Sequence, residues 1–154
     1  MLDIVKAIEE YQHQQVRELF IEYVDSLGID LSFQNIESEL QNIPGEYASP
    51  EGCILLAMYD EQPAGCVALR KIDEKTCEMK RLYVKPDFKG KGIGRDLASA
   101  IIEEAKNIGY RYIRLDTLPT MKPAISLYHS LGFYSIEPYR FNPVQGTKYM
   151  ELKF

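Results

Sequence analysis

Residues 89–95, with the sequence KGKGIGR, combine alternating glycines with basic side chains. Glycine has no Cβ atom, so the backbone N–H groups of such a turn can point together toward one ligand. The apolar periodicity that follows predicts a helix, whose N-terminus adds unpaired N–H donors and a partial positive charge. Together these features indicate a site for a pyrophosphate. The glycines are Gly90, Gly92 and Gly94, and the basic residues are Lys89, Lys91 and Arg95.

Two common phosphate-binding motifs do not match this turn. A P-loop requires GxxxxGK followed by Ser or Thr, which the chain lacks. The dinucleotide fingerprint GxGxxG lacks its third glycine, whether it is counted from Gly90 or from Gly92. The simpler alternative is a tight strand-to-helix connection with solvated lysines. The strand pattern and the Pro86 turn before the glycines, together with the long helix pattern after them, favour a binding site.

Two segments of the chain resemble motifs of the GNAT N-acetyltransferase superfamily. Residues 82–97, LYVKPDFKGKGIGRDL, resemble its acetyl-CoA-binding motif, Arg/Gln-x-x-Gly-x-Gly/Ala, with Lys89 in place of the usual Arg or Gln. Residues 124–133, AISLYHSLGF, resemble its Ala-x-x-Leu-Tyr-x-x-x-Gly-Phe segment. Their order and separation are also as in the family. Met121 stands where the family often has an Asn that contacts the pantetheine arm.

This resemblance implies acetyl-CoA as the co-substrate. No metal is expected, because the three cysteines lie in strand patterns and the two histidines are distant, which is no metal-binding pattern. In the family, backbone N–H groups at the end of the strand hold the thioester oxygen, and the pantetheine amides pair with the same strand edge. The glycine turn, residues 89–95, is then expected to hold the pyrophosphate. The implied cofactor-binding residues are Leu82, Tyr83, Val84, Lys89, Gly90, Lys91, Gly92, Ile93, Gly94 and Arg95.

Tyr128 is the candidate general acid. Acetyl transfer needs a polarised thioester, a deprotonated amine and a proton for the leaving thiolate. Tyr128 matches the family's tyrosine, whose hydroxyl can reach the sulfur of CoA. The alternative is an aromatic side chain packed between helix and sheet.

Glu78 is the candidate general base. It matches, by its position before the glycine turn, a glutamate that some family members use as a base through water. The two-residue period of a strand predicts that it lies on the same face as Leu82 and Val84. The alternative is an ion pair with Lys80 or Arg81, or a charge at the edge of the strand. Many family members need no essential base, because a small fraction of free amine suffices.

The strand arginines and several loop tyrosines are candidates for contacts with the acceptor. Arg70, Arg81 and Arg114 lie in strand patterns, where a guanidinium needs an acidic partner or a ligand carboxylate. Pairing with Glu78 or Asp116 is the simpler interpretation. The loop residues Tyr47, Tyr139 and Arg140 could line an acceptor pocket or only pack. The candidate substrate residues are Arg70, Arg81, Tyr47 and Tyr139.

Composition limits the function classes. The chain has 154 residues, which suits one domain spanning 1–154, and a net charge of −5, which argues against a general nucleic-acid binder. No apolar run is long enough for a membrane helix, and the N-terminus has no signal-peptide pattern. Three cysteines in strand patterns form no disulfide framework, so we expect reduced thiols and a cytoplasmic protein. The oligomeric state stays open, with a homodimer among the alternatives.

The order of predicted elements indicates a mixed sheet. Antiparallel hairpins occupy the N-terminal half and β-α-β units the C-terminal half, as in the α/β fold of the GNAT superfamily. The predicted strands are residues 2–7, 53–59, 64–72, 77–84, 112–117, 133–138 and 148–154. The predicted helices are residues 11–27, 33–43, 93–108 and 123–131.

Three functions follow as hypotheses. The leading one is acetyl transfer from acetyl-CoA to a primary amine of a small molecule or peptide. A small zwitterionic or anionic amine is the favoured acceptor, because the chain is acidic and its strand arginines could receive a carboxylate. The second is a non-catalytic module that binds acetyl-CoA for regulation or for a partner. The third, a nucleotide-phosphate binder of another fold, would bind ATP or NAD and not CoA. Release of free thiol in the presence of amines separates the first from the others.

Overall fold

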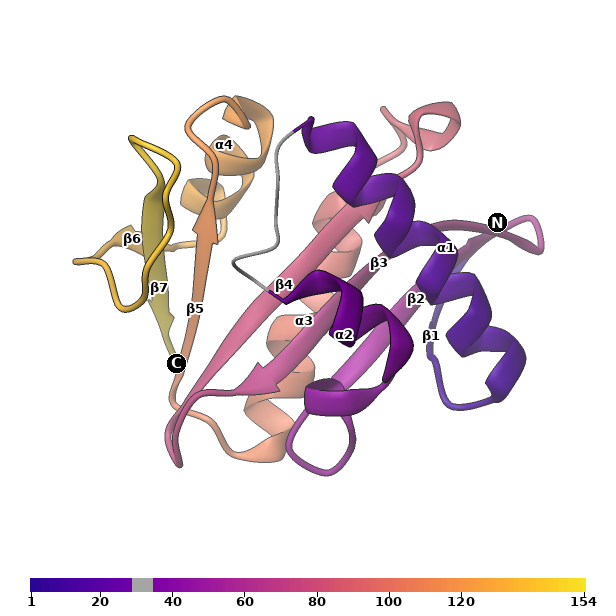
Figure 1. Ribbon diagram of the computed structural model, residues 1–154, viewed down its shortest axis with the longest axis horizontal. Helices are drawn as coiled ribbons and strands as arrows, with labels where there is room; N and C mark the ends of the chain where they lie inside the picture. The colour runs from indigo at the N-terminus through magenta and orange to yellow at the C-terminus, as the bar shows by residue number, and fades with distance from the viewer. Residues whose placement is uncertain (29–34) are drawn as a thin grey trace.

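The computed structural model describes residues 1–28 and 35–154 (Figure 1). These residues contain seven strands and four α-helices. The strands are β1 (Leu2–Lys6), β2 (Cys53–Tyr59), β3 (Gln62–Lys71), β4 (Thr76–Val84), β5 (Tyr112–Thr117), β6 (Tyr134–Ser135) and β7 (Lys148–Lys153). The helices are α1 (Glu10–Leu27), α2 (Ile36–Gln41), α3 (Ile93–Ile108) and α4 (Lys122–Ser130), with the 3-10 helices η2 (Gly45–Tyr47) and η3 (Pro86–Phe88).

The strands form one mixed sheet in the order β1-β2-β3-β4-β5-β7-β6, with β4 and β5 parallel and the other pairs antiparallel. Helices α1 and α2 cover the face seen in Figure 1, and α3 packs on the opposite face. Alternation along β2 divides its side chains between two cores: Leu55 packs with α3, whereas Ile54 and Leu56 pack with α1. The predicted mixed α/β fold is confirmed.

The parallel pairing of β4 and β5 is short. It joins Thr76–Glu78 to Tyr112–Arg114, and beyond these residues no pairing continues. Figure 1 shows the two strands separating toward their carboxyl ends. The carboxyl half of β4 therefore pairs only with β3, and an opening forms in the sheet between β4 and β5.

Three predicted elements differ in the structure. The strand predicted at 133–138 is reduced to Tyr134–Ser135, because Pro138 has no N–H for a ladder and the chain leaves the sheet at this edge. The helix predicted at 33–43 is Ile36–Gln41 within the described residues, and Phe33 lies outside them. Tyr47, predicted in a loop, belongs to η2 and is buried edge-on against Phe20.

No helix in residues 1–28 and 35–154 has the length and apolar character needed to cross a membrane. The same described residues contain no group of three or more His, Cys, Asp or Glu side chains that could hold a metal ion.

Candidate active site

The glycine turn connects β4 to α3 through backbone conformations that favour glycine. Gly90 has a φ of 83°, and Gly92, the N-cap residue of α3, has a φ of 78°. Both values lie in the left-handed region that side chains with a Cβ rarely adopt. No side chain caps the N-terminus of α3, so its first N–H groups can bind a ligand. The chemistry of this donor set fits a pyrophosphate.

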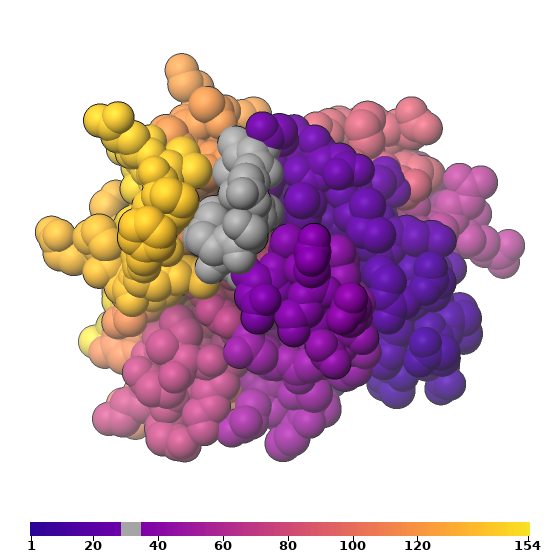
Figure 2. Space-filling view, viewed as in Figure 1, coloured from indigo at the N-terminus to yellow at the C-terminus, as the bar shows by residue number. Residues whose placement is uncertain are grey.

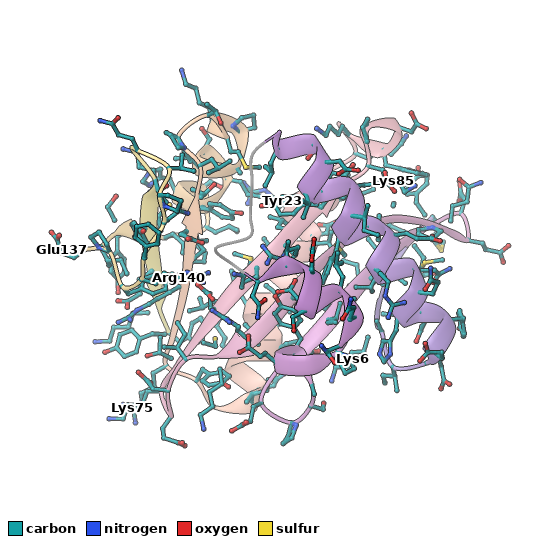
Figure 3. The ribbon with its side chains drawn as sticks, in the orientation of Figure 1. Lys6, Tyr23, Lys75, Lys85, Glu137 and Arg140 are labelled. Atoms are coloured by element: carbon teal, nitrogen blue, oxygen red, sulfur yellow. The ribbon has the colours of Figure 1, made fainter. Side chains whose placement is uncertain are left out.

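A groove of about 530 Å³ extends from the glycine turn along the end of β4. Leu82 and Val84 of β4 line one wall, and Ala124 and Leu127 of α4 line another. Tyr23 of α1, labelled in Figure 3, also contributes. The predicted cofactor residues that line the groove are Leu82, Tyr83, Val84, Lys89, Gly90, Gly92, Ile93 and Gly94.

The two other predicted cofactor residues lie outside the groove lining. Nζ of Lys91 lies 5.1 Å from the ring centroid of Tyr59, in cation–π geometry. Nη2 of Arg95 donates a hydrogen bond of 2.6 Å to Oγ of Ser130, which ties α3 to α4. Both side chains still place positive charge beside the turn, although neither side chain forms the wall of the groove.

A bulge in β4 changes which residues share a face of the strand. Arg81 has a φ of 61°, and the pairing with β3 shifts between Cys66 and Ala68. As a result Leu82 and Val84 pack with the α3 core. Glu78 instead lies opposite Arg70 on the face toward α2. The prediction that Glu78 shares a face with Leu82 and Val84 is therefore wrong, because the bulge interrupts the two-residue alternation.

The opening between β4 and β5 contains a cavity of about 50 Å³. Lys80 and Leu82 line it from β4, Asp116 and Thr117 from β5, and Tyr128 from α4. The cavity shares Tyr23, Leu82 and Met121 with the groove that begins at the glycine turn. A ligand bound along the groove can therefore place its end in the sheet opening.

Tyr128 is placed where a proton donor could act. Its side chain is 6% exposed, lines the cavity and packs against Phe133 with ring centroids 5.7 Å apart. Burial raises the pKa of the Tyr128 phenol, and the nearby Tyr23 and Asp116 act in the same direction with smaller effects. The hydroxyl therefore keeps its proton at neutral pH.

Glu78 is the centre of a buried ion-pair network and has 0% exposure. Nε of Arg70 donates to its Oε1 at 2.7 Å, and the hydroxyl of Tyr139 donates to its Oε2 at 2.6 Å. Nη2 of Arg140 lies 2.8 Å from the same Oε2. Burial acts to raise the pKa of Glu78, but the charges of Lys80, Arg140 and Arg70 outweigh it and the pKa is lowered. A carboxylate held in this way is a weak base.

The strand arginines pair with acids. Besides its contact with Glu78, Arg70 pairs with the exposed Glu46. Arg81 donates from Nε and Nη2 to the carboxylate of Glu39 in α2, at 2.9 and 3.1 Å. Nε of Arg114 donates to Glu151 at 2.8 Å. The ion-pair interpretation thus holds for all three arginines. Of the two acids predicted as partners, Glu78 pairs with Arg70, whereas Arg81 and Arg114 pair with other glutamates.

A second pocket, of about 390 Å³, lies between α2, η2 and the C-terminal loop. Helix α2 and the C-terminal residues are both exposed on the face shown in Figure 2. Of the four candidate substrate residues, Arg70 and Tyr47 line this pocket, whereas Arg81 lines the sheet opening and Tyr139 donates a hydrogen bond to Glu78. Its lining residues are Asn35, Ser38, Glu39, Asn42, Pro44, Gly45, Glu46, Tyr47, Arg70 and Arg140.

Comparisons with known proteins agree with these features. Residues 8–133 match the family model described as the acetyltransferase (GNAT) family. An uncharacterised N-acetyltransferase of Schizosaccharomyces pombe is 42% identical over 134 residues, which cover 86% of this chain and 82% of that protein. The chain belongs to the GNAT acetyltransferase family. The resemblance found in the two motifs is confirmed, and the chain is a GNAT-type N-acetyltransferase.

One solved structure and one longer relative are also similar to this GNAT chain. The crystal structure of an acetyltransferase from Streptococcus agalactiae 2603 has a TM-score of 0.81 and covers 99% of this chain and 98% of that chain. Its sequence identity is 23%, so the likeness concerns the fold. N-acetylaspartate synthetase of Danio rerio is 31% identical over 119 residues, which cover 76% of this chain and 39% of that protein.

Lys80, Asp116 and Asn142 line the sheet opening of this GNAT protein and were not among the predicted site residues. Asn142 donates to Oδ2 of Asp116 at 3.3 Å, and Nε of Arg140 lies 3.4 Å from the same oxygen. One sequence signal could have pointed to Lys80: it is a charged residue within residues 77–84, CEMKRLYV, a segment that is predicted to be a strand. The positions of Asp116 and Asn142 depend on tertiary contacts and leave no local pattern.

Proposed function

We propose that this protein transfers the acetyl group of acetyl-CoA to the primary amine of a small acceptor that carries a carboxylate. The observation that supports this most is the divergence of β4 and β5, which connects the groove at the glycine turn to the cavity beside Tyr128. The pyrophosphate would lie on the N–H groups of the turn and the pantetheine arm along the end of β4. The acetyl group would then reach the sheet opening.

In the transfer step, the free amine attacks the carbonyl carbon of the thioester and the C–N bond forms. The C–S bond breaks, the electron pair remains on sulfur, and the phenol of Tyr128 donates its proton to the thiolate. The nitrogen, which is positively charged after the attack, loses one proton, and this proton restores the phenol of Tyr128. Backbone N–H groups near the bulge at Arg81 would stabilise the carbonyl oxygen as it gains negative charge.

The acceptor class is supported by the chemistry of the second pocket. The guanidinium groups of Arg70 and Arg140 line it, and guanidinium is the side chain best suited to a ligand carboxylate. The relative named N-acetylaspartate synthetase makes the product of such an acceptor, as its name states.

A matched pair of acceptors tests this class. We expect L-aspartate to be acetylated with a kcat/KM at least ~10-fold above that of aspartic acid diamide, because a charge-assisted hydrogen bond to a carboxylate contributes about 1.5–3 kcal/mol. The rate is followed as free thiol released from acetyl-CoA. Faster turnover of spermidine or of a lysine-containing peptide than of any free amino acid would contradict this acceptor class.

Replacing Tyr128 by Phe removes the proposed proton donor and keeps the ring. We expect kcat to fall by ~10- to 10²-fold, the low end for a general acid because water can substitute, with acetyl-CoA affinity nearly unchanged. Steady-state kinetics and calorimetry measure the two quantities. Tyr110→Phe is the control, because it removes another buried tyrosine's hydroxyl, one that donates to the carbonyl oxygen of Glu51 at 2.6 Å. A Tyr128→Phe variant with wild-type kcat would show that Tyr128 only packs.

A further inference from the structure

Lys80 is a buried lysine beside the reaction centre proposed above. Its side chain comes from β4 at the sheet opening, is 7% exposed and lines the same cavity as Tyr128 and Asp116. In the pairing of β3 with β4, Lys80 lies opposite Ala68, on the same face of β4 as Glu78. Burial of a lysine is costly unless the amine is paired or neutral, because a charged amine loses its hydration there.

We propose that Lys80, and not Glu78, accepts the proton that the acceptor ammonium must lose before it attacks the thioester. This proposal rests on the acetyl transfer proposed above. The proton moves from the ammonium nitrogen of the acceptor to the neutral Nζ of Lys80, and the lone pair that it leaves behind forms the C–N bond. Lys80 then carries the positive charge and returns its proton to solvent before the next cycle.

The position of Glu78 argues against the alternative. Both of its carboxylate oxygens already accept hydrogen bonds, from Arg70 and Tyr139, and Arg140 lies beside one of them. It also does not line the cavity that contains Tyr128. A base must lie within hydrogen-bond reach of the proton that it removes, directly or through one water.

Burial and the neighbouring arginines favour the neutral form of Lys80, whereas Glu78 favours the charged form. The charged and titratable groups around Lys80 among the described residues come from several elements: Glu78 and Arg81 from β4, Arg70 from β3, Asp116 from β5, Arg140 from the C-terminal loop, Tyr23 from α1 and Tyr128 from α4. Burial and the neighbouring Arg81 lower the pKa of Lys80 to about 7, with Arg140 and Arg70 acting in the same direction and Glu78 against them. A base with a pKa near the working pH is the effective kind.

The pH dependence of turnover tests the proposal through two substitutions with different outcomes. L-aspartate is the acceptor probe. If L-aspartate is not turned over, the probe is the most reactive amine among asparagine, methionine, spermidine and a peptide with a free N-terminus. Lys80→Met should lower kcat/KM at pH 7.5 by ~10²-fold, with the deficit shrinking above pH ~9 as the acceptor loses its own proton. Lys80→Arg should show a similar deficit, because a guanidinium keeps the charge and does not deprotonate.

Lys75→Met is the matched control, since Lys75 is exposed in the β3–β4 turn at the far end of the sheet (Figure 3). It should keep the wild-type profile. Unchanged affinity of each variant for CoA, measured by calorimetry, shows that the variant is folded. Full activity in Lys80→Arg would overturn the proposal and indicate a role for positive charge. Wild-type pH profiles in both Lys80 variants would overturn it as well, while leaving the proposed acetyl transfer intact.

A direct titration gives a readout that does not depend on turnover. NMR of lysine Cε carbons labelled with ¹³C, with the Lys80 signal assigned from its absence in Lys80→Arg, should show a midpoint near pH 7. A midpoint above pH ~9.5, close to that of an ordinary lysine, would contradict the proposal. If the wild type releases no thiol with any amine, the proposed function fails and the role of Lys80 in it fails too.

Discussion

Replacement of Gly92 by glutamate will abolish acetyl-CoA binding while the protein stays folded. The carboxylate would stand at the N-terminus of α3, where the pyrophosphate is expected, and juxtaposed like charges cost several kcal/mol, so we expect the Kd to rise by at least ~10²-fold. A Cβ at Gly92 meets no heavy atom within 4 Å, so the side chain has room. Its negative charge is also favourable at a helix N-terminus. Calorimetry with CoA measures the change.

Gly109→Glu is the matched control for this substitution. Gly109 ends the same helix, also has a left-handed φ, of 112°, and a Cβ there likewise meets nothing within 4 Å. Both substitutions therefore strain the backbone, but in Gly109→Glu the charge lies at the opposite end of α3. We expect CoA affinity to be unchanged in this variant. Unchanged affinity in a folded Gly92→Glu variant would place the cofactor elsewhere.

Replacement of Glu78 by glutamine will cause the largest loss of stability among the substitutions considered. It leaves Arg70 and Arg140 without their shared buried carboxylate. Breaking a buried ion pair by removing one partner typically costs ~3–5 kcal/mol. We expect that loss in the free energy of unfolding, measured by urea denaturation at pH 7. Glu46→Gln is the control, because it removes a 71% exposed partner of the same Arg70 and should cost no more than about 1 kcal/mol.

The pH dependence of this loss follows from the lowered pKa of Glu78. A carboxylate whose pKa is lower in the folded state stabilises the protein fully above its unfolded pKa of about 4.3. That contribution is lost as the pH falls below this value and through the folded pKa. The stability difference between wild type and Glu78→Gln should therefore narrow in acid. A difference that stays constant from pH 7 to pH 3, or is absent at pH 7, would contradict the role of Glu78 as an ionised centre.

Local sequence patterns were sufficient for most of the fold and for the glycine turn at which the groove begins. The spacing of Ile93, Leu97 and Ile101 predicted α3, and those residues are buried in the core as expected. The glycines before them predicted the turn, since only residues that tolerate a positive φ fit at Gly90 and Gly92. These signals are short-range, so they do not depend on knowing the tertiary structure.

The sheet opening and the second pocket depend on contacts that local patterns do not encode. A single positive φ at Arg81 moves Glu78 to the other face of β4 from Leu82, and a strict two-residue period cannot anticipate it. The convergence of Arg70 and Arg140 on Glu78 joins residues that are far apart in sequence. The depth of Lys80 likewise depends on how β4 and β5 separate.

The most direct test of the central claim is the product of the reaction. Acetyl-CoA labelled with ¹³C at the acetyl carbonyl is incubated with the protein and L-aspartate, and with the other amines named above, while free thiol and labelled amide are both measured. We predict one acetamide formed for each thiol released, at a rate far above that without amine. Acetyl-CoA that binds at the glycine turn but releases no more thiol with any amine than without one would contradict the claim and indicate a non-catalytic acetyl-CoA-binding module.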